Sequence, residues 1–90
     1  MAKITHMESM VANVIADCHD LYQEHFSDVM VEDIVFETEL TVKSVKGALG
    51  SLIKKDYVFA EDVNGEYNVY YLTKEGFMAL RGDVPEYMEW

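Results

Sequence analysis

The stretch Thr41–Lys55, TVKSVKGALGSLIKK, organises this chain, because it holds four of the seven basic residues and no acidic residue. In a helix, with about 100° between successive residues, its apolar side chains and most of its lysines would lie on opposite sides. The apolar side is Val42, Val45, Leu49, Leu52 and Ile53, with Ala48 at its margin. The other side is Lys43, Lys46, Gly47, Gly50 and Lys54. Thr41 is suited to cap this helix, because its hydroxyl can accept a hydrogen bond from an N–H of the first turn.

Composition limits the classes of protein to which the chain can belong. Its 90 residues make one domain, and half of them are hydrophobic, which is typical of a folding sequence. Seventeen acidic residues against seven basic ones give a formal charge of -10, which opposes non-specific attraction to phosphates or anionic lipid. A single cysteine allows no internal disulfide, and the sequence has neither a membrane-spanning apolar run nor a signal-peptide pattern. We therefore expect a soluble cytoplasmic protein that does not bind membranes.

Two helices are predicted before the basic stretch, at about Thr5–Glu24 and about Met30–Glu39, because apolar residues recur there every three or four positions. Phe36 falls outside the apolar stripe of the second helix, and we expect it to pack on a neighbouring element. Leu40 and Thr41 connect that helix to the basic one, which favours a steep helix-turn-helix crossing. The apolar stripe of the first helix is Ile4, Met7, Val11, Val14, Ile15, Cys18, Leu21, Tyr22 and His25.

A β-hairpin is predicted after the basic stretch, with strands at Tyr57–Val63 and Glu66–Leu72. Asn64-Gly65 between them is a strong signal for a two-residue turn, because both turn positions favour positive φ. The core-facing pairs in that register are Val58 with Tyr71, Ala60 with Val69 and Asp62 with Tyr67, while Phe59 and Tyr70 pair on the opposite face.

A closing helix, Lys74–Arg81, is predicted after the hairpin, with Thr73 as its cap and Gly82 at its end. We expect residues 1–82 to form the domain and residues 83–90 to form an acidic, aromatic tail. The tail aromatics are expected to cover the core or a dimer seam.

No catalytic or metal-binding site is predicted. The sequence has no Gly-rich phosphate loop, nucleophile elbow or metal-ligand spacing, and it singles out no pair of catalytic carboxylates. Cys18 lies on the apolar stripe beside acidic residues, which favours a packing role over a reactive thiolate. His6, His19 and His25 are expected at surface or boundary positions. We therefore expect neither an enzyme nor a cofactor.

The predicted order of helix, helix-turn-helix, hairpin and helix is that of a winged helix domain. The sequence resembles the winged helix-turn-helix family, particularly the MarR-like and related small bacterial and phage regulators. TVKSVKGALGSLIKKDYV at 41–58 is similar to a recognition helix that runs into the first wing strand, and VYYLTKEGFMAL at 69–80 to the second strand and closing helix. With VEDIVFETEL at 31–40, the resemblance covers about Val31 to Leu80. It implies an α+β fold with three helices, a two-stranded wing hairpin and a short closing helix.

The resemblance also implies a transcriptional regulator that binds double-stranded DNA, with the 41–55 helix in the major groove. The residues at the matching positions are Thr41, Lys43, Ser44, Lys46, Gly47 and Lys54. Lysine can neutralise phosphates or reach guanine edges, and serine or threonine can contact phosphate or base. Gly47 and Gly50 each cost about 1 kcal/mol relative to alanine in a helix, which close approach to another backbone or relaxed constraint at the surface would explain. A homodimer through the first helix and the tail would supply paired half-sites.

The acidic residues lead to a second hypothesis. The wing turn has Glu61, Asp62 and Glu66 and no basic residue, and Glu37 and Glu39 precede the basic helix, where they oppose phosphate. The alternative is a protein-interaction module, of the DNA-mimic or anti-regulator type, in which the three wing acids engage a basic partner protein. A third interpretation of the lysines is a solvated face that offsets neighbouring acids within the fold.

Overall fold

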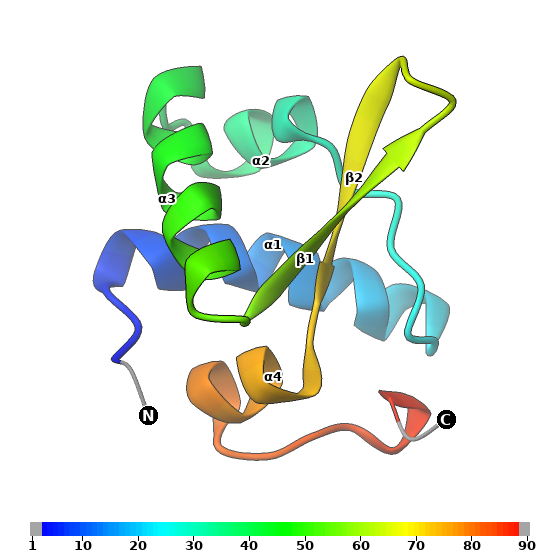
Figure 1. The fold of residues 1–90 in the computed structure, drawn as a ribbon. Helices are drawn as coiled ribbons and strands as arrows, with labels where there is room; N and C mark the ends of the chain where they lie inside the picture. The colour runs from blue at the N-terminus through cyan, green and yellow to red at the C-terminus, as the bar shows by residue number, and fades with distance from the viewer. Residues whose placement is uncertain (1–2, 89–90) are drawn as a thin grey trace.

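The computed structural model describes residues 3–88, which form four α-helices, one two-stranded antiparallel sheet and a short 3-10 helix (Figure 1). The elements are α1 (His6–Tyr22), α2 (Val31–Thr38), α3 (Val42–Lys54), β1 (Val58–Val63), β2 (Tyr67–Leu72), α4 (Lys74–Arg81) and η1 (Glu86–Met88). The predicted α+β winged helix-turn-helix fold is confirmed, and α2 and α3 cross steeply (Figure 1). Trp90 of the predicted tail lies outside the described residues.

Side-chain caps define where the helices begin. α1, α3 and α4 each follow a threonine whose hydroxyl accepts from the N–H three residues later, at Thr5, Thr41 and Thr73. α2 begins after Met30, and there the Asp33 carboxylate accepts from the Met30 N–H at 2.9 Å. Such caps contribute about 1 kcal/mol each, so the sequence itself sets these boundaries.

The core lies between α1, the inner sides of α2, α3 and α4, and one face of the hairpin. Its largest fully buried apolar side chains are Val11, Ile15, Ile34, Val45, Leu52, Leu72 and Phe77. The apolar side of α3 is rotated from the predicted one: Ala48 is buried, whereas Val42 and Ile53 are exposed. The buried residues of α3, Val45, Ala48, Leu49 and Leu52, follow the spacing of a single helical stripe.

The hairpin contains the predicted turn but not the predicted register. Asn64 and Gly65 have φ of 56° and 72°, and the Glu66 N–H donates to the Val63 carbonyl at 3.0 Å. Val63 nevertheless pairs with Tyr67, so Glu66 belongs to the connection and every later pair is displaced by one residue. The observed pairs are Val58 with Leu72, Phe59 with Tyr71, Ala60 with Tyr70, Glu61 with Val69, Asp62 with Asn68 and Val63 with Tyr67.

This register turns the other side of β2 toward the core. Tyr70 and Leu72 join the core, whereas Tyr71 pairs with Phe59 on the opposite face. The Tyr70 N–H donates to the Val29 carbonyl at 2.9 Å, so the connection before α2 flanks β2 on its free edge. Burial of Tyr70 and Leu72 and this additional backbone bond together favour the observed register.

A close contact holds α4 against the start of β1. A Cβ atom at Gly76 would lie 2.2 Å from the Tyr57 carbonyl oxygen, so α4 can reach this position only with glycine there. The Thr73 hydroxyl donates to the Asp56 carbonyl at 2.7 Å, which ties the cap of α4 to the same turn. The Thr-x-x-Gly pattern at Thr73–Gly76 therefore serves both helix capping and close packing.

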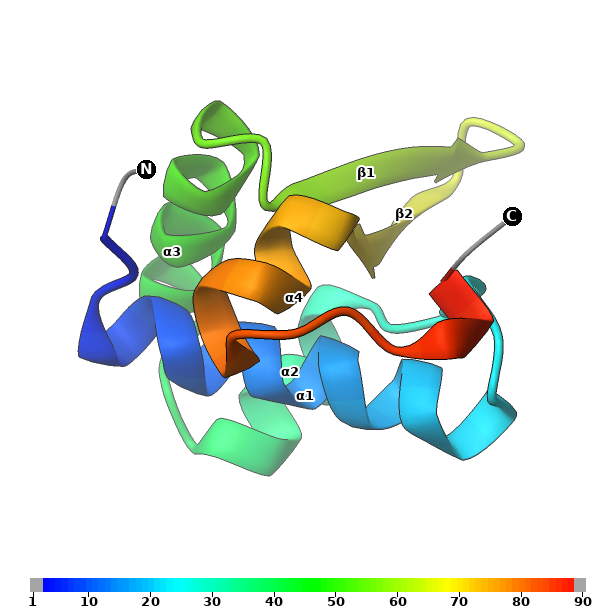
Figure 2. The ribbon, with the colours of Figure 1, turned by 90° about the horizontal axis from the view of Figure 1, so that it is seen from below.

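The segment after α4 runs back along α1 to η1 (Figure 2). Arg81 pairs with Asp20 of α1 at 2.8 Å, and the Tyr87 hydroxyl donates to the same carboxylate. Met88 is buried and the Tyr87 ring packs against Phe77, so both tail side chains cover the core.

Candidate nucleic-acid interface

The outward side of α3 carries the residues that the sequence predicts to face DNA. Thr41, Lys43, Lys46, Gly47 and Lys54 are exposed, and Ser44 is partly exposed. The structure thus brings all six predicted residues together along one helix. Thr41 also caps the helix, since its hydroxyl accepts from the Ser44 N–H at 3.1 Å.

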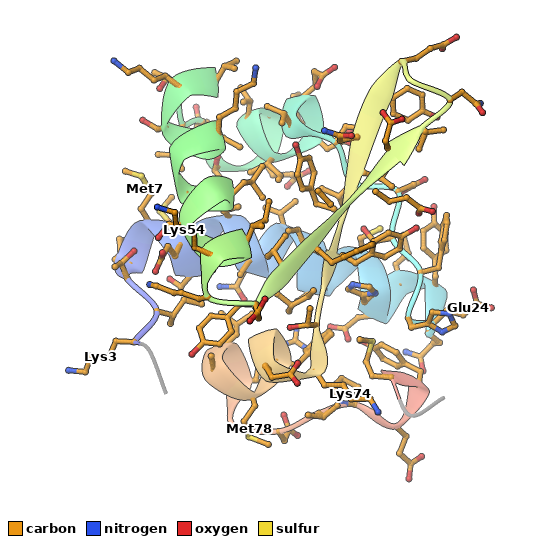
Figure 3. All side chains as sticks on the ribbon, viewed as in Figure 1. Lys3, Met7, Glu24, Lys54, Lys74 and Met78 are labelled. Carbon is orange, nitrogen blue, oxygen red and sulfur yellow. The ribbon has the colours of Figure 1, made fainter. Side chains whose placement is uncertain are left out.

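Three lysines on this side make no ion pair within the described part of the chain. The ion pairs found among residues 3–88 involve Lys55 and Arg81, and none involves Lys43, Lys46 or Lys54. Lys54 lies on α3, away from Lys3 and Lys74 at other parts of the surface (Figure 3). The charges of the three lysines are therefore available to a partner that approaches α3.

The two glycines of α3 lie on the same exposed side. A Cβ atom at Gly47 or Gly50 would meet no heavy atom within 4 Å. No steric contact within the described fold requires glycine at either position, although each glycine lowers helix stability relative to alanine. The surface of α3 between the lysines therefore has no protruding side chain at the two glycines, and another molecule can approach the helix backbone there.

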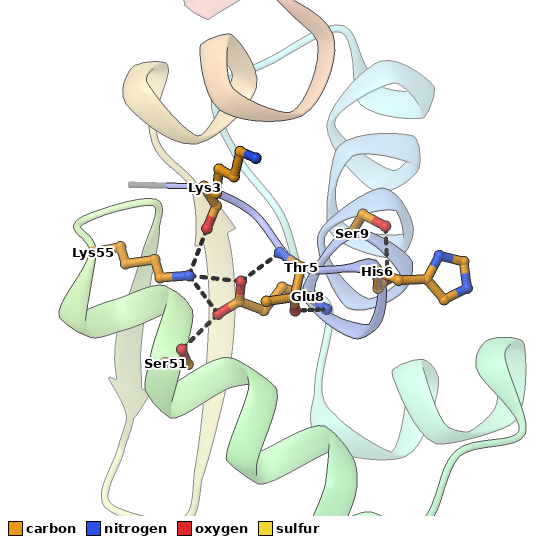
Figure 4. A network of polar contacts seen from close by, with 7 residues as sticks. All are labelled: Lys3, Thr5, His6, Glu8, Ser9, Ser51 and Lys55. Atoms are coloured by element: carbon orange, nitrogen blue, oxygen red, sulfur yellow. Dashed lines mark hydrogen bonds and ion pairs between the residues drawn. The ribbon is translucent and has the colours of Figure 1, made fainter. Parts of the chain in front are cut away.

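Lys55, the fourth basic residue of the stretch, has a structural role (Figure 4). Its Nζ donates to the two carboxylate oxygens of Glu8, at 2.7 and 3.0 Å, and to the Lys3 carbonyl at 2.8 Å. Glu8 also accepts from the Ser51 hydroxyl at 2.5 Å and from the Thr5 N–H at 2.8 Å. This network joins the C-terminal end of α3 to the start of α1 and thereby fixes the position of α3.

Glu8 is ionised in this network although it is buried. Burial raises the pKa of Glu8, but the hydrogen bonds from Lys55, Ser51 and the Thr5 backbone outweigh burial and lower the pKa to about 2. Sequence reasoning missed Glu8. The available signal was the Thr5-x-x-Glu8 capping-box pattern, in which the glutamate returns a hydrogen bond to the cap.

The wing acids of the alternative hypothesis, Glu61, Asp62 and Glu66, are all exposed. Asp62 accepts from the Gly65 N–H at 3.1 Å and so stabilises the turn. Glu61 accepts from the Tyr71 hydroxyl. Burial, followed by this bond to Glu61, raises the pKa of Tyr71 to about 12, so the phenol stays protonated at neutral pH.

The outer side of α2 combines acidic residues with an exposed aromatic ring. Phe36, which was expected to pack on a neighbouring element, is 82% exposed. The acids Glu32, Asp33 and Glu37 are exposed on the same helix. The Phe36 side chain is exposed because no other element formed by residues 3–88 covers the side of α2 on which it lies.

His19, which was expected at a surface or boundary position, is fully buried. Its Nδ1 lies 3.1 Å from the Glu24 carbonyl oxygen, and its Nε2 lies 3.0 Å from the Leu72 N–H. A neutral ring with the proton on Nδ1 satisfies both contacts, and burial lowers the pKa of His19. His19 therefore links the end of α1 to β2. His6 and His25 are exposed, as expected.

Other chemical features of residues 3–88 are less informative about function. Cys18 is partly buried, its Sγ lies 3.4 Å from an Asp28 carboxylate oxygen, and burial raises its pKa. Within residues 3–88, no group of three or more His, Cys, Asp or Glu side chains is arranged to hold a metal ion. No helix in the same range has the length and apolar character needed to cross a membrane.

The elements and their order define the winged helix-turn-helix class, and comparison with known proteins agrees at the level of the fold. No protein-family model matches the chain, and no curated protein matches its sequence. Among solved structures, the chain is similar to BpsR of Bordetella bronchiseptica, in a study of how 6-hydroxynicotinic acid regulates the DNA binding of that protein. The TM-score is 0.73 at 16% sequence identity, over 89% of this chain and 56% of the BpsR chain. The chain thus spans little more than half the length of BpsR.

Proposed function

We propose that this protein is a small DNA-binding regulator that docks α3 in the major groove of duplex DNA. The observation that carries the proposal is the outward side of α3, where Lys43, Lys46 and Lys54 are exposed and make no ion pair within residues 3–88. In helix-turn-helix proteins, the second helix enters the major groove and its N-terminal residues contact base edges. Thr41, Lys43, Ser44, Lys46 and Gly47 occupy that part of α3, and Lys54 would contact phosphate farther along.

The rigid attachment of α3 is consistent with this role. Lys55 and Ser51 fasten its C-terminal end to Glu8, while the N-terminal half projects its side chains outward. A docking helix loses less conformational entropy on binding when its position is fixed beforehand. Gly47 and Gly50 would allow the DNA backbone to approach the helix closely, because nothing in the fold fills the space beside them.

Because the formal charge is -10, DNA binding depends on how the charges are distributed over the surface and not on the net charge. Contacts at short range are screened less than the field of distant acids, since the Debye length is about 8 Å at physiological ionic strength. Binding should therefore depend on the α3 lysines far more than on basic residues elsewhere on the surface.

The test compares two double variants with the same change in net charge. Labelled random-sequence duplex DNA is titrated with Lys43→Ala plus Lys46→Ala, and with Lys3→Ala plus Lys74→Ala, and anisotropy is followed from low to higher salt. We expect the α3 double variant to bind about tenfold or more weakly and to lose about 2 from the log-log salt slope, because two phosphate contacts are removed. The matched double variant should bind like the wild type. Equal weakening of both variants, or no binding by the wild type at low salt, would contradict the proposal.

A second candidate function is a protein-interaction module that binds a basic partner. The exposed wing acids Glu61, Asp62 and Glu66 favour it, together with the acidic outer side of α2 and its exposed Phe36. A surface of one charge sign accelerates association with a partner of the opposite sign. In this case, neutralisation of the three wing acids should slow association with a basic protein while DNA binding stays unchanged.

A further inference from the structure

A groove opens at the base of the wing, at the edge of the core. Its walls are Phe26 from the α1–α2 connection, Phe59 of β1, Tyr71 of β2, Lys74 and Glu75 of α4, and Met88 of η1. Figures 1 and 2 both place the end of α1 near η1. The groove has a volume of about 590 Å³, which is within the range of binding sites for small groups.

Three aromatic rings from separate segments form one wall. The Tyr71 ring lies between Phe26, at 6.2 Å between centroids, and Phe59, at 6.0 Å. Phe59 is 57% exposed, so this side chain presents much of its apolar surface to solvent. The buried His19 ring lies 6.3 Å from the Tyr71 ring, so the wall rests on the core. The Tyr71 ring is thus supported by the core, and the exposed Phe26 and Phe59 rings beside it are accessible to a partner.

Two carboxylates line the same groove. Glu61 is oriented by the Tyr71 hydroxyl, and Glu75 lies in the first turn of α4. Lys74 adds one positive charge to the lining. Aromatic faces and carboxylates together attract organic cations, because the ring quadrupole and the anionic oxygens both favour a positive charge.

We infer that this groove binds an arginine or lysine side chain of a basic partner protein. The stem of such a side chain would pack on Phe59 and Phe26, and its charged end would reach Glu61 and Glu75. A second copy of the chain is disfavoured as the occupant, because two proteins with a formal charge of -10 repel each other. Nucleic acid is disfavoured as well, because its phosphates would face the two carboxylates.

The inference rests on the second candidate function, the protein-interaction module, and it assigns the contact with the basic partner to this groove. It does not depend on DNA docking by α3. The groove lies at the wing base and α4, whereas the lysines proposed to bind DNA lie on α3. A failure of one proposal can therefore be distinguished from a failure of the other with the same set of variants.

The test is an NMR titration of the labelled protein with a capped tri-arginine peptide and, separately, with a capped tri-glutamine peptide. We expect saturable shifts of the Phe26, Phe59 and Tyr71 signals with tri-arginine only. Glu61→Gln plus Glu75→Gln should weaken binding about tenfold, as two charge-assisted contacts are lost. Lys74→Gln should strengthen binding a fewfold, because it removes a like charge. Glu61→Gln keeps an acceptor for the Tyr71 hydroxyl, so the groove should keep its shape.

The matched control is Asp17→Asn plus Glu39→Gln, which makes the same change in net charge at two exposed residues that do not line the groove. Its affinity for tri-arginine should equal that of the wild type. Equal weakening by both double variants would show attraction to net charge alone and would overturn the inference. Shifts of the groove signals with tri-glutamine of the same size would overturn it as well, as would the absence of saturable shifts. DNA anisotropy with the groove variants should match the wild type.

Discussion

The glycines of α4 and α3 are under opposite constraints. At Gly76 of α4, an added Cβ would lie 2.2 Å from the Tyr57 carbonyl oxygen and 2.8 Å from Leu72 Cδ1. At Gly47 and Gly50 of α3, an added Cβ would meet nothing within 4 Å. Packing therefore explains the glycine of α4, whereas no steric contact within the described fold explains the glycines of α3. The comparison directs attention to what approaches α3 from outside.

The lysines of α3 show the same contrast within one helix. Lys55 is held by Glu8 and the Lys3 carbonyl, and its side chain is only 22% exposed. Lys43 and Lys46 are exposed and have no ion-pair partner among residues 3–88. One end of the helix thus contributes to the stability of the fold, and the other leaves its charges open to a partner.

The largest expected effect is at Gly76. Gly76→Ala should lower the free energy of unfolding by about 3 kcal/mol, because the methyl group forces α4 away from Tyr57 and Leu72. Gly76 is not among the glycines with positive φ in the described chain, so the loss would come from the contact and not from the backbone conformation. Urea denaturation of the variant and the wild type measures the difference. If the free energy of unfolding fell by less than about 1 kcal/mol, α4 could move away from Tyr57 at little cost. Close packing would then no longer explain the glycine at position 76.

The next effect is at the anchored end of α3. Glu8→Gln should lower stability by about 2 kcal/mol, because Lys55 and Ser51 lose a charged acceptor; partial exposure of Lys55 limits the loss. Asp17→Asn is the matched control on the same helix, since Asp17 is exposed and lies 3.7 Å from Arg81. Its stability should stay within about 0.5 kcal/mol of the wild type.

The same residue gives an acid dependence with a defined sign. The pKa of Glu8 is about 2 in the folded protein against an ordinary value of 4.5, so the unfolded chain binds the proton more readily. The stabilisation is therefore complete above pH 4.5 and is lost as the pH falls toward 2. The stability difference between wild type and Glu8→Gln should narrow over that interval. A constant difference would show that Glu8 is not ionised in the fold.

The first helix shows how far the sequence could predict the packing. Its existence and approximate bounds followed from apolar spacing, but its buried stripe was predicted only in part: Val11 and Ile15 are buried, whereas Met7, Leu21 and Tyr22 are exposed. The buried residues are Glu8, Val11, Ala12, Ile15, Ala16 and His19, a regular helical spacing that includes two polar side chains. Hydrophobicity alone excludes Glu8 and His19, because their burial depends on partners far along the chain. Those partners, Lys55 and Leu72, meet them only once the fold is formed.

In the hairpin and the candidate site as well, local features could be predicted from the sequence, whereas features that depend on tertiary packing could not. The positive φ preference of Asn64-Gly65 identified the turn, but the register depended on tertiary burial of Tyr70 and Leu72. The exposed lysines of α3 could be found from sequence, because opposite faces of a helix follow from residue spacing. The groove at the wing base could not, because its rings come from three segments and the predicted register paired Phe59 with Tyr70 instead of Tyr71.

A fourth prediction concerns His19, which is buried near the C-terminal end of α1. Burial lowers the pKa of His19, so protonation favours the unfolded chain and stability should decline as the pH falls below the ordinary value of 6.5. The slope from this single group is at most about 1.4 kcal/mol for each pH unit. NMR titration of the imidazole signals, with exposed His6→Gln to aid assignment, measures the pKa directly. A His19 pKa at or above 6.5 would contradict the buried neutral ring.

The smallest expected change in stability is at Gly47 and Gly50, and it tests most directly whether a partner accounts for the glycines of α3. Gly47→Ala and Gly50→Ala should each raise the free energy of unfolding by up to about 1 kcal/mol, since alanine favours a helix and the space beside both positions is open. If α3 docks closely on DNA, the same substitutions should weaken binding in the anisotropy titration although they stabilise the fold. Gain of stability with loss of binding would show that a partner accounts for these glycines. Gain of stability with unchanged binding would instead show that the lysines act at a distance and that the open side of α3 is not in contact with DNA.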